Sequence, residues 1–257
     1  MTDEQAAEQS QEPASAENAL REQLYTASFG RGASWVGEGW EYFKAAPGLW
    51  IGMVVLSFVL TMVASVLPII GFFAGILMLY FMAGMMKLCD NIHHQTNPQF
   101  GDLFAGFSER AVPLLLTGIL YLVGTMVIGV IVVIVMVIFG GAGAIFGSGG
   151  SDEVLAAAMG VGLLLALLFG MLFALPLIMA IWFAPALIML NNLDAVEAMK
   201  QSFMGCLQNI LPFLLFGIVF FVLFILGSIP LLLGLLIVMP MMYAATYAAY
   251  REIYLEP

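Results

Sequence analysis

The sequence predicts an all-α integral membrane protein with six transmembrane helices. These form three parallel hairpin repeats, each preceded by an amphipathic helix on the cytoplasmic face. Of the 257 residues, 63% are hydrophobic and 9% are charged, against about 25% charged residues in an ordinary soluble domain. Long windows carry no charge, and all seven Lys and Arg residues fall on one side of the resulting topology. The net charge of −10 also argues against a nucleic-acid partner, which requires a basic surface.

The chain begins with an acidic segment. Residues 1–24 carry six carboxylates against one basic residue, Arg21, and most of the remaining residues are Gln, Ala and Ser. Such a segment cannot bury enough apolar area to offset the entropy lost on ordering. We therefore expect residues 1–32 to form a disordered tail and residues 33–257 to form the transmembrane domain.

Six segments are long and apolar enough to be membrane spans, because about 20 residues cross the hydrocarbon of a bilayer. They are residues 48–67, 71–88, 112–138, 154–175 or longer, 210–228 and 230–250. The fourth segment stays uncharged as far as Leu193 and contains Pro176 and Pro185. Since proline kinks helices, we expect one kinked helix that leaves the bilayer near Pro185, with two separate segments as the alternative.

The basic residues orient these spans. If the N-terminus is inside, every basic residue is cytoplasmic: Arg21, Arg31, Lys44, Lys87, Arg110, Lys200 and Arg251. The longest outer loop, around residues 140–153, contains only Asp152 and Glu153 as charged residues. This distribution follows the positive-inside rule. It predicts a multi-pass protein of the bacterial inner membrane with cytoplasmic N- and C-termini.

An internal repeat is indicated by three segments that begin at Lys44, Arg110 and Asn209. Each has a proline three residues on, a leucine five on and a glycine eight on, and each opens a predicted span. Proline suits the first turn of a helix, and a glycine one turn deeper allows close helix packing. We expect repeats over about 33–90, 99–190 and 193–251.

Each repeat also opens with an amphipathic stretch that we expect to lie in the membrane interface, aromatic face toward the lipid. The residues concerned are Val36, Trp40 and Phe43 in the first repeat, Phe100 to Phe107 in the second, and Val196, Met199 and Phe203 in the third.

Candidate chemical groups lie outside the spans, because no Asp, Glu, Lys, Arg or His falls in the middle of one. This disfavours ion-coupled transport and charged filter rings. Asp90, His93 and His94 have spacing that could suit a metal, and Asp102 and Glu109 could act as a carboxylate pair. Exposed helix ends explain both groups more simply. We predict no catalytic, cofactor-binding or metal-binding residue, no cofactor and, for Cys89 and Cys206, no structural disulfide.

Parts of the sequence resemble known families. The stretches Gly39-Trp-Glu-Tyr-Phe-Lys-Ala-Ala-Pro-Gly-Leu-Trp50, Phe100-Gly-Asp-Leu-Phe-Ala-Gly-Phe107 and Pro113-Leu-Leu-Leu116 resemble a family of uncharacterised six-span proteins of Gram-negative bacteria. The likeness covers most of residues 35–251. More distantly, Ala195–Phe203 is similar to the membrane portion of some glycerophosphodiester phosphodiesterases. The resemblance implies an inner-membrane location and brings no catalytic residues.

The functional prediction is a non-catalytic inner-membrane protein, not an enzyme, that acts as a scaffold or accessory subunit or in envelope maintenance. Its expected partners are membrane lipids and a membrane-protein partner or further copies of itself. The alternative is a permease or lipid-handling transporter with an uncharged passage. A wide apolar cavity open to one leaflet would favour that alternative, and a solidly packed bundle would favour the first function.

Overall fold

The computed structural model describes residues 20–66, 71, 73–146 and 152–255, and this part of the chain is helical. In chain order the helices are α2 (Arg31–Ala45), α3 (Pro47–Val66), α5 (Ala74–His93), η1 (Phe100–Phe104), α6 (Ala105–Glu109), α7 (Ala111–Phe146), α8 (Asp152–Trp182), α9 (Ala184–Asn191), α10 (Ala195–Gln208), α11 (Ile210–Ser228) and α12 (Leu235–Tyr254). The all-α prediction is confirmed for these residues.

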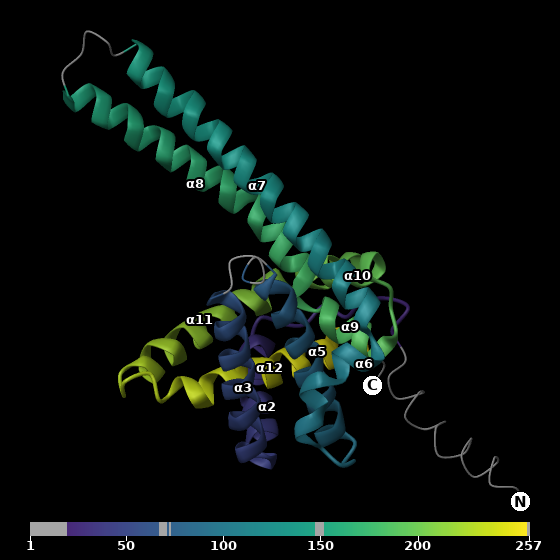
Figure 1. The fold of residues 1–257 in the computed structure, drawn as a ribbon. Helices are drawn as coiled ribbons and strands as arrows, with labels where there is room; N and C mark the ends of the chain where they lie inside the picture. The colour runs from purple at the N-terminus through teal and green to yellow at the C-terminus, as the bar shows by residue number, and fades with distance from the viewer. Residues whose placement is uncertain (1–19, 67–70, 72, 147–151, 256–257) are drawn as a thin grey trace, which may run out of the picture.

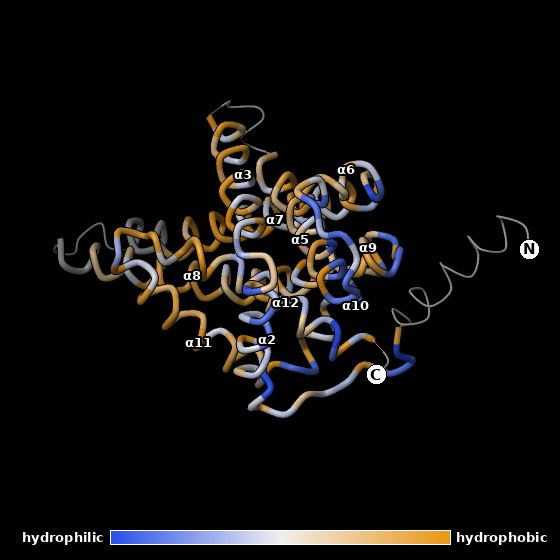
Figure 2. The backbone as a smooth tube through the Cα atoms, turned by 90° about the horizontal axis from the view of Figure 1, so that it is seen from below, coloured by the Kyte–Doolittle hydropathy of each residue, from blue (hydrophilic) through white to orange (hydrophobic). Residues whose placement is uncertain are grey.

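Two parts of the molecule differ in shape. Helices α7 and α8 lie side by side as a long hairpin that projects away from the other helices (Figure 1). We call the remaining helices the body; in it, α12 contacts α2, α3, α5 and α11. Figure 2 shows hydrophilic segments gathered around α2, α9 and α10, whereas α3, α8 and α11 are largely hydrophobic. The body therefore carries the polar chemistry, and the projecting helices are apolar.

Within the described residues, five segments qualify as candidate membrane spans by length and composition: Pro47–Val66, Ala74–His93, Ala111–Phe139, Met159–Asn191 and Ile210–Ser228. They correspond to the first five predicted spans. The sixth predicted segment, residues 230–250, overlaps α12, which is not among the candidates. Helix α12 is rich in alanine and tyrosine and is buried almost continuously from Tyr243 to Tyr250. Because its neighbours are protein helices, its sequence need not be as apolar as that of a lipid-facing helix.

The fourth segment is broken near its second proline. Helix α8 continues through Pro176 and ends at Trp182, and Phe183 separates it from α9. Pro185 lies in the first turn of α9, where its missing N–H costs no intrahelical hydrogen bond. The segment is thus two helices rather than one kinked helix. The second, of 8 residues, is too short to be a span of its own.

Residues 20–30 differ from the disordered tail that we expected up to residue 32. We call them the strap. The Arg21 backbone N–H donates to the Tyr254 carbonyl at 2.8 Å, and the Tyr25 N–H donates to the Ile253 carbonyl at 3.0 Å. Leu20 forms an isolated antiparallel bridge with Leu255. These backbone bonds to the end of α12 order a segment whose composition alone predicted disorder; residues 1–19 lie outside the described part of the chain.

The same local geometry opens each predicted repeat. A helix ends at Ala46 (φ −150°, ψ 59°), at Arg110 (φ −137°, ψ 34°) and at Asn209 (φ −117°, ψ 31°), and the next helix starts at the following residue. A proline is the first residue of α3 and the third residue of α7 and of α11. The break therefore falls one residue before the proline in the first copy and three residues before it in the other two.

The apolar face of the first amphipathic helix is placed differently from our expectation. Helix α2 packs on α12 and α11 and buries Trp35, Val36 and Phe43, while Trp40 is exposed. In α10 the buried face is a different one, formed by Ala195, Ala198, Ser202, Gly205 and Cys206. Packing within the protein thus takes up the face that we had assigned to the interface in α2. In α10 it takes up the small residues and leaves the predicted face unburied, with Val196 69% exposed.

Candidate functional site

A polar cluster joins α5 to α12 and α2. The Tyr247 hydroxyl donates to Asp90 Oδ1 at 3.0 Å, and the Tyr42 hydroxyl lies 3.1 Å from His93 Nδ1. Arg251 Nη1 is 3.0 Å from the same nitrogen of His93. Since a guanidinium can only donate, His93 Nδ1 is the acceptor in its contact with Arg251. Burial raises the pKa of Tyr42 to about 12, so this hydroxyl stays protonated.

The candidate metal ligands are therefore used for structure. His94 Nδ1 lies 2.9 Å from its own helix carbonyl, that of Asp90, and 3.4 Å from Asp90 Oδ1. Among the described residues no group of three or more His, Cys, Asp or Glu side chains is placed to hold a metal ion. Asp90 and His93 instead fasten the end of α5 to α12 and α2, and His94 contacts Asp90 within α5.

Asp102 and Glu109, which the sequence offered only as a less favoured carboxylate pair, have separate hydrogen-bond or ion-pair partners. Asp102 accepts hydrogen bonds from Asn91 Nδ2 at 2.8 Å and from the Gln99 backbone N–H at 2.9 Å. Glu109 instead pairs with Lys87 at 3.4 Å. Each carboxylate thus holds a separate loop or helix end. Cys89 and Cys206 are free and buried.

An ion pair that the sequence did not indicate closes the body beside the strap. Arg31 donates through Nε and Nη2 to the Glu252 carboxylate at 2.5–2.9 Å. The fully buried Trp35 donates its indole N–H to the same carboxylate at 2.7 Å. These bonds join the start of α2 to the end of α12, and the two carboxylates of Glu252 and Glu38 raise the pKa of Arg31.

Asn209 ties the strap to the break between α10 and α11. Its side chain is fully buried. Oδ1 accepts from the Ala27 backbone N–H at 2.7 Å, and Nδ2 donates to the carbonyls of Tyr25 and Gly205, both at 3.0 Å. The sequence marked Asn209 as the polar residue of the third repeat, but it could not show that its carboxamide binds a segment about 180 residues earlier.

An apolar cavity of about 450 Å³ lies between α8 and α11. Its lining comes from four helices: Leu175, Ile178, Met179 and Trp182 of α8, Cys206 of α10, Ile210, Phe213, Leu214, Phe216, Gly217 and Phe220 of α11, and Met242 of α12. Burial raises the pKa of Cys206 to about 12, so its thiol stays neutral. A cavity of this size is within the range of small-ligand sites.

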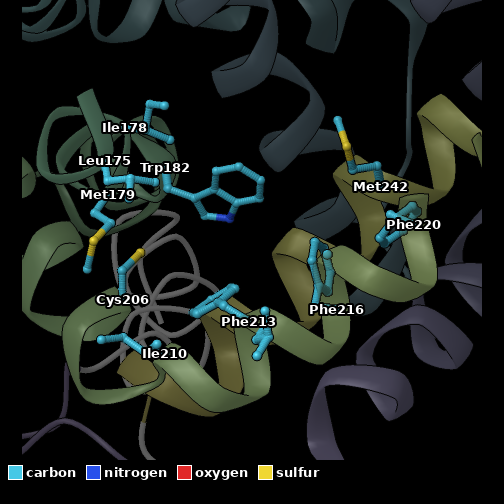
Figure 3. A pocket seen from close by; sticks show the side chains of 12 residues that line it. Leu175, Ile178, Met179, Trp182, Cys206, Ile210, Phe213, Phe216, Phe220 and Met242 are labelled. Atoms are coloured by element: carbon cyan, nitrogen blue, oxygen red, sulfur yellow. The ribbon is translucent and has the colours of Figure 1, made fainter. Parts of the chain in front are cut away.

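One polar group in the cavity lacks a partner. Figure 3 shows the indole ring of Trp182 projecting from α8 toward Phe213 and Phe216. The ring centroids lie 6.4 Å and 6.3 Å from those two phenyl rings. Trp182 Nε1 is buried and has no hydrogen-bond acceptor among the described residues. Because a buried N–H without an acceptor is costly, this donor marks the cavity as a candidate ligand site.

The architecture and the candidate site define an α-helical chain with five helices able to cross a membrane and an apolar cavity beside two of them. Comparisons with protein-family models, with curated proteins and with solved structures find no match to it. The resemblance to uncharacterised six-span proteins therefore stays a prediction from the residues quoted above.

Sequence reasoning missed the cavity because its walls are far apart in the chain. Leu175 and Ile210 belong to different predicted repeats, and Met242 lies more than 30 residues after Ile210, in α12. The one available signal was Trp182 itself, an indole donor at the end of a long apolar segment.

Proposed function

We propose that the chain is a non-catalytic bacterial inner-membrane protein with six spans, which acts by contact with another membrane protein as a scaffold or accessory subunit. The observation that carries this proposal is the length of the α7–α8 hairpin. The apolar part of α7, Ala111–Phe139, has 29 residues and is therefore about 44 Å long. At a typical tilt of about 20° it covers about 41 Å, against a hydrocarbon thickness of about 30 Å.

Apolar surface beyond the lipid favours a protein partner. In Ala111–Phe139 the most apolar window contains no buried residue, and in Met159–Asn191 only 6% of that window is buried. Side chains near the outer end, such as Val137 and Met159, are more than half exposed, at 65% and 58%. The hairpin therefore offers a long apolar side surface that the chain's own helices leave free beyond its base.

The six-span topology draws support from the strap. Its hydrogen bonds to Ile253 and Tyr254 put the two ends of the described chain on the same side of any membrane that the helices cross. An even number of crossings follows. If all five candidate spans cross, a sixth crossing is needed, and α12 is the remaining helix of sufficient length. The equivalent helix breaks at Ala46, Arg110 and Asn209 support three hairpin repeats, and the basic residues support cytoplasmic termini.

Photo-crosslinking in native membranes tests the scaffold proposal. A photoreactive amino acid at Val137 or Met159 is expected to give one discrete protein adduct, whether with a second copy or with another membrane protein. The same amino acid at Phe58 of α3, which is 67% exposed in a helix of ordinary span length, serves as the control and is expected to give lipid adducts. Lipid adducts alone at all three positions would contradict the proposal.

A lipid-handling protein is a second candidate. An apolar cavity beside the membrane favours such a function over a passive scaffold, and an apolar cavity is present between α8 and α11. This function requires that the occupant exchanges or moves. Transfer of fluorescent phospholipid between vesicles, with and without the reconstituted protein, tests it directly. Unchanged transfer would count against lipid handling and leave the scaffold proposal intact.

A further inference from the structure

We infer that the cavity between α8 and α11 binds one acyl chain of a phospholipid, and that the Trp182 indole N–H donates a hydrogen bond to the ester carbonyl of that chain. This inference deepens the second candidate function. It rests on that function only for the assumption that the cavity lies beside the bilayer. It concerns binding, and does not require that the lipid is moved.

The length of the cavity suits one leaflet. Its wall on α11 runs from Ile210 to Phe220 through Phe213, Leu214 and Gly217, which is one face of the helix. Ten residues of α-helix rise about 15 Å, which is half of the hydrocarbon thickness of about 30 Å. The cavity therefore follows α11 for the depth that an acyl chain of one leaflet occupies.

The polar donor lies where the chemistry of a lipid requires it. Phe213 and Phe216, which flank the Trp182 ring, lie in the first two turns of α11, beside the break at Asn209. An ester carbonyl is an acceptor that stands at the start of an acyl chain, and indole N–H groups commonly lie at that depth of the membrane. The rest of the lining is apolar apart from the neutral thiol of Cys206, as methylene groups require.

The cavity is too small to enclose a whole helix. A helix about 10 Å wide fills roughly 1,200 Å³ over a length of about 15 Å, more than the cavity holds, whereas a single acyl chain is thinner. The rim residues Leu175, Ile178, Ile210 and Leu214 are 41–55% exposed. They face the same surroundings as the outer surfaces of α8 and α11, so a lipid chain can enter from the side.

The decisive test compares ester with ether lipids. The full-length protein is reconstituted in vesicles of phosphatidylglycerol, containing diester and diether forms of equal chain length in equal amounts. It is then extracted in mild detergent, and retained lipid is quantified by native mass spectrometry. The wild type is expected to retain the ester form preferentially, by about 2- to 10-fold, as one neutral hydrogen bond allows. Trp182→Phe keeps an aromatic ring and is expected to lose this preference.

Filling the cavity gives a second, independent measurement. A Cβ added at Gly217 meets nothing within 4 Å, so Gly217→Leu places a side chain in the cavity and is expected to abolish lipid retention. Gly160→Leu is the matched control, because Gly160 is an exposed α8 glycine with equally open space outside the cavity.

Three outcomes would overturn the inference. These are equal retention of ester and ether lipid by the wild type, an ester preference that survives in Trp182→Phe, and retention by Gly217→Leu equal to that of the control. If Gly217→Leu fails to fold, the comparison of ester with ether lipid in the wild type and in Trp182→Phe decides alone. Binding that passes these tests without lipid transfer between vesicles would refute lipid handling but not the site.

Discussion

Two glycines of α2 allow a sharp test of how the body is packed, because they lie two residues apart on opposite faces of one helix. A Cβ added at Gly39 would lie 2.7 Å from the Ala245 backbone nitrogen and 2.8 Å from the Met241 carbonyl oxygen of α12. A Cβ added at Gly37 meets nothing within 4 Å. The substitutions Gly39→Ala and Gly37→Ala therefore add the same methyl group to a helix–helix contact and to open space.

The two effects are expected to have opposite signs. Alanine is better than glycine in a helix interior by about 0.5–1 kcal/mol, so Gly37→Ala should raise the free energy of unfolding by about that amount. Gly39→Ala gains the same propensity but must push apart two helix backbones, and overpacking typically costs about 1–3 kcal/mol. Because backbone atoms cannot rotate away as a side chain can, the net change at Gly39 should be destabilising.

The measurement is denaturant unfolding of each purified variant in detergent micelles, followed by tryptophan fluorescence, since Trp35 of α2 is fully buried. The account expects a lower midpoint than wild type for Gly39→Ala and a higher one for Gly37→Ala. Equal shifts in the same direction would show that α2 does not pack closely on α12, and the description of the body would be wrong.

Three further predictions concern the strap and the cavity. Asn209→Ala leaves the buried Ala27 N–H without its acceptor and should lower the free energy of unfolding by about 1–3 kcal/mol; Gln208→Ala, at an exposed neighbour, should change little. A chain that starts at Ser28 lacks the strap's bonds to α12 and should unfold at a lower temperature in a thermal melt, whereas a truncation that stops before the strap should not. With Cys89 replaced by Ala, alkylation at pH 8 should be roughly a thousandfold slower at Cys206 than at an ordinary thiol, because burial raises the pKa of Cys206 to about 12. Rapid alkylation in the folded protein would show that this thiol is open to water.

The long apolar helices were predictable because their segments are uncharged and strongly hydrophobic over 20 residues or more. Uncharged windows located α3, α7 and α11 to within a few residues except at the outer end of α7, which continues to Phe146. The end of α8 was less predictable. A proline permits either a kink or the start of a new helix. The structure has a new helix, and at the break Ser202 donates to the Met179 carbonyl and accepts from the Phe183 N–H.

Contacts between distant segments were beyond the sequence. The strap follows an acidic segment and has no clear helical or strand pattern of its own. Its order comes from backbone bonds to Ile253 and Tyr254, which leave no trace in side-chain patterning. The aromatic pattern of α2 correctly indicated a helix with one apolar face. An apolar face can pack against lipid or against another helix such as α12, and the sequence does not distinguish the two. Periodicity shows which side of a helix is apolar and does not show what covers it.

Labelling on the two sides of the membrane tests the central claim most directly, namely that the α11–α12 turn and the α5–η1 loop lie on opposite faces. Single cysteines are placed in a cysteine-free background at Leu231, 88% exposed between α11 and α12, and at Thr96, exposed after α5. In intact spheroplasts an impermeant maleimide is expected to label Leu231→Cys and to leave Thr96→Cys unlabelled until the membrane is opened. Equal labelling of both before opening would place the two turns on the same side and contradict a hairpin in which α12 crosses back.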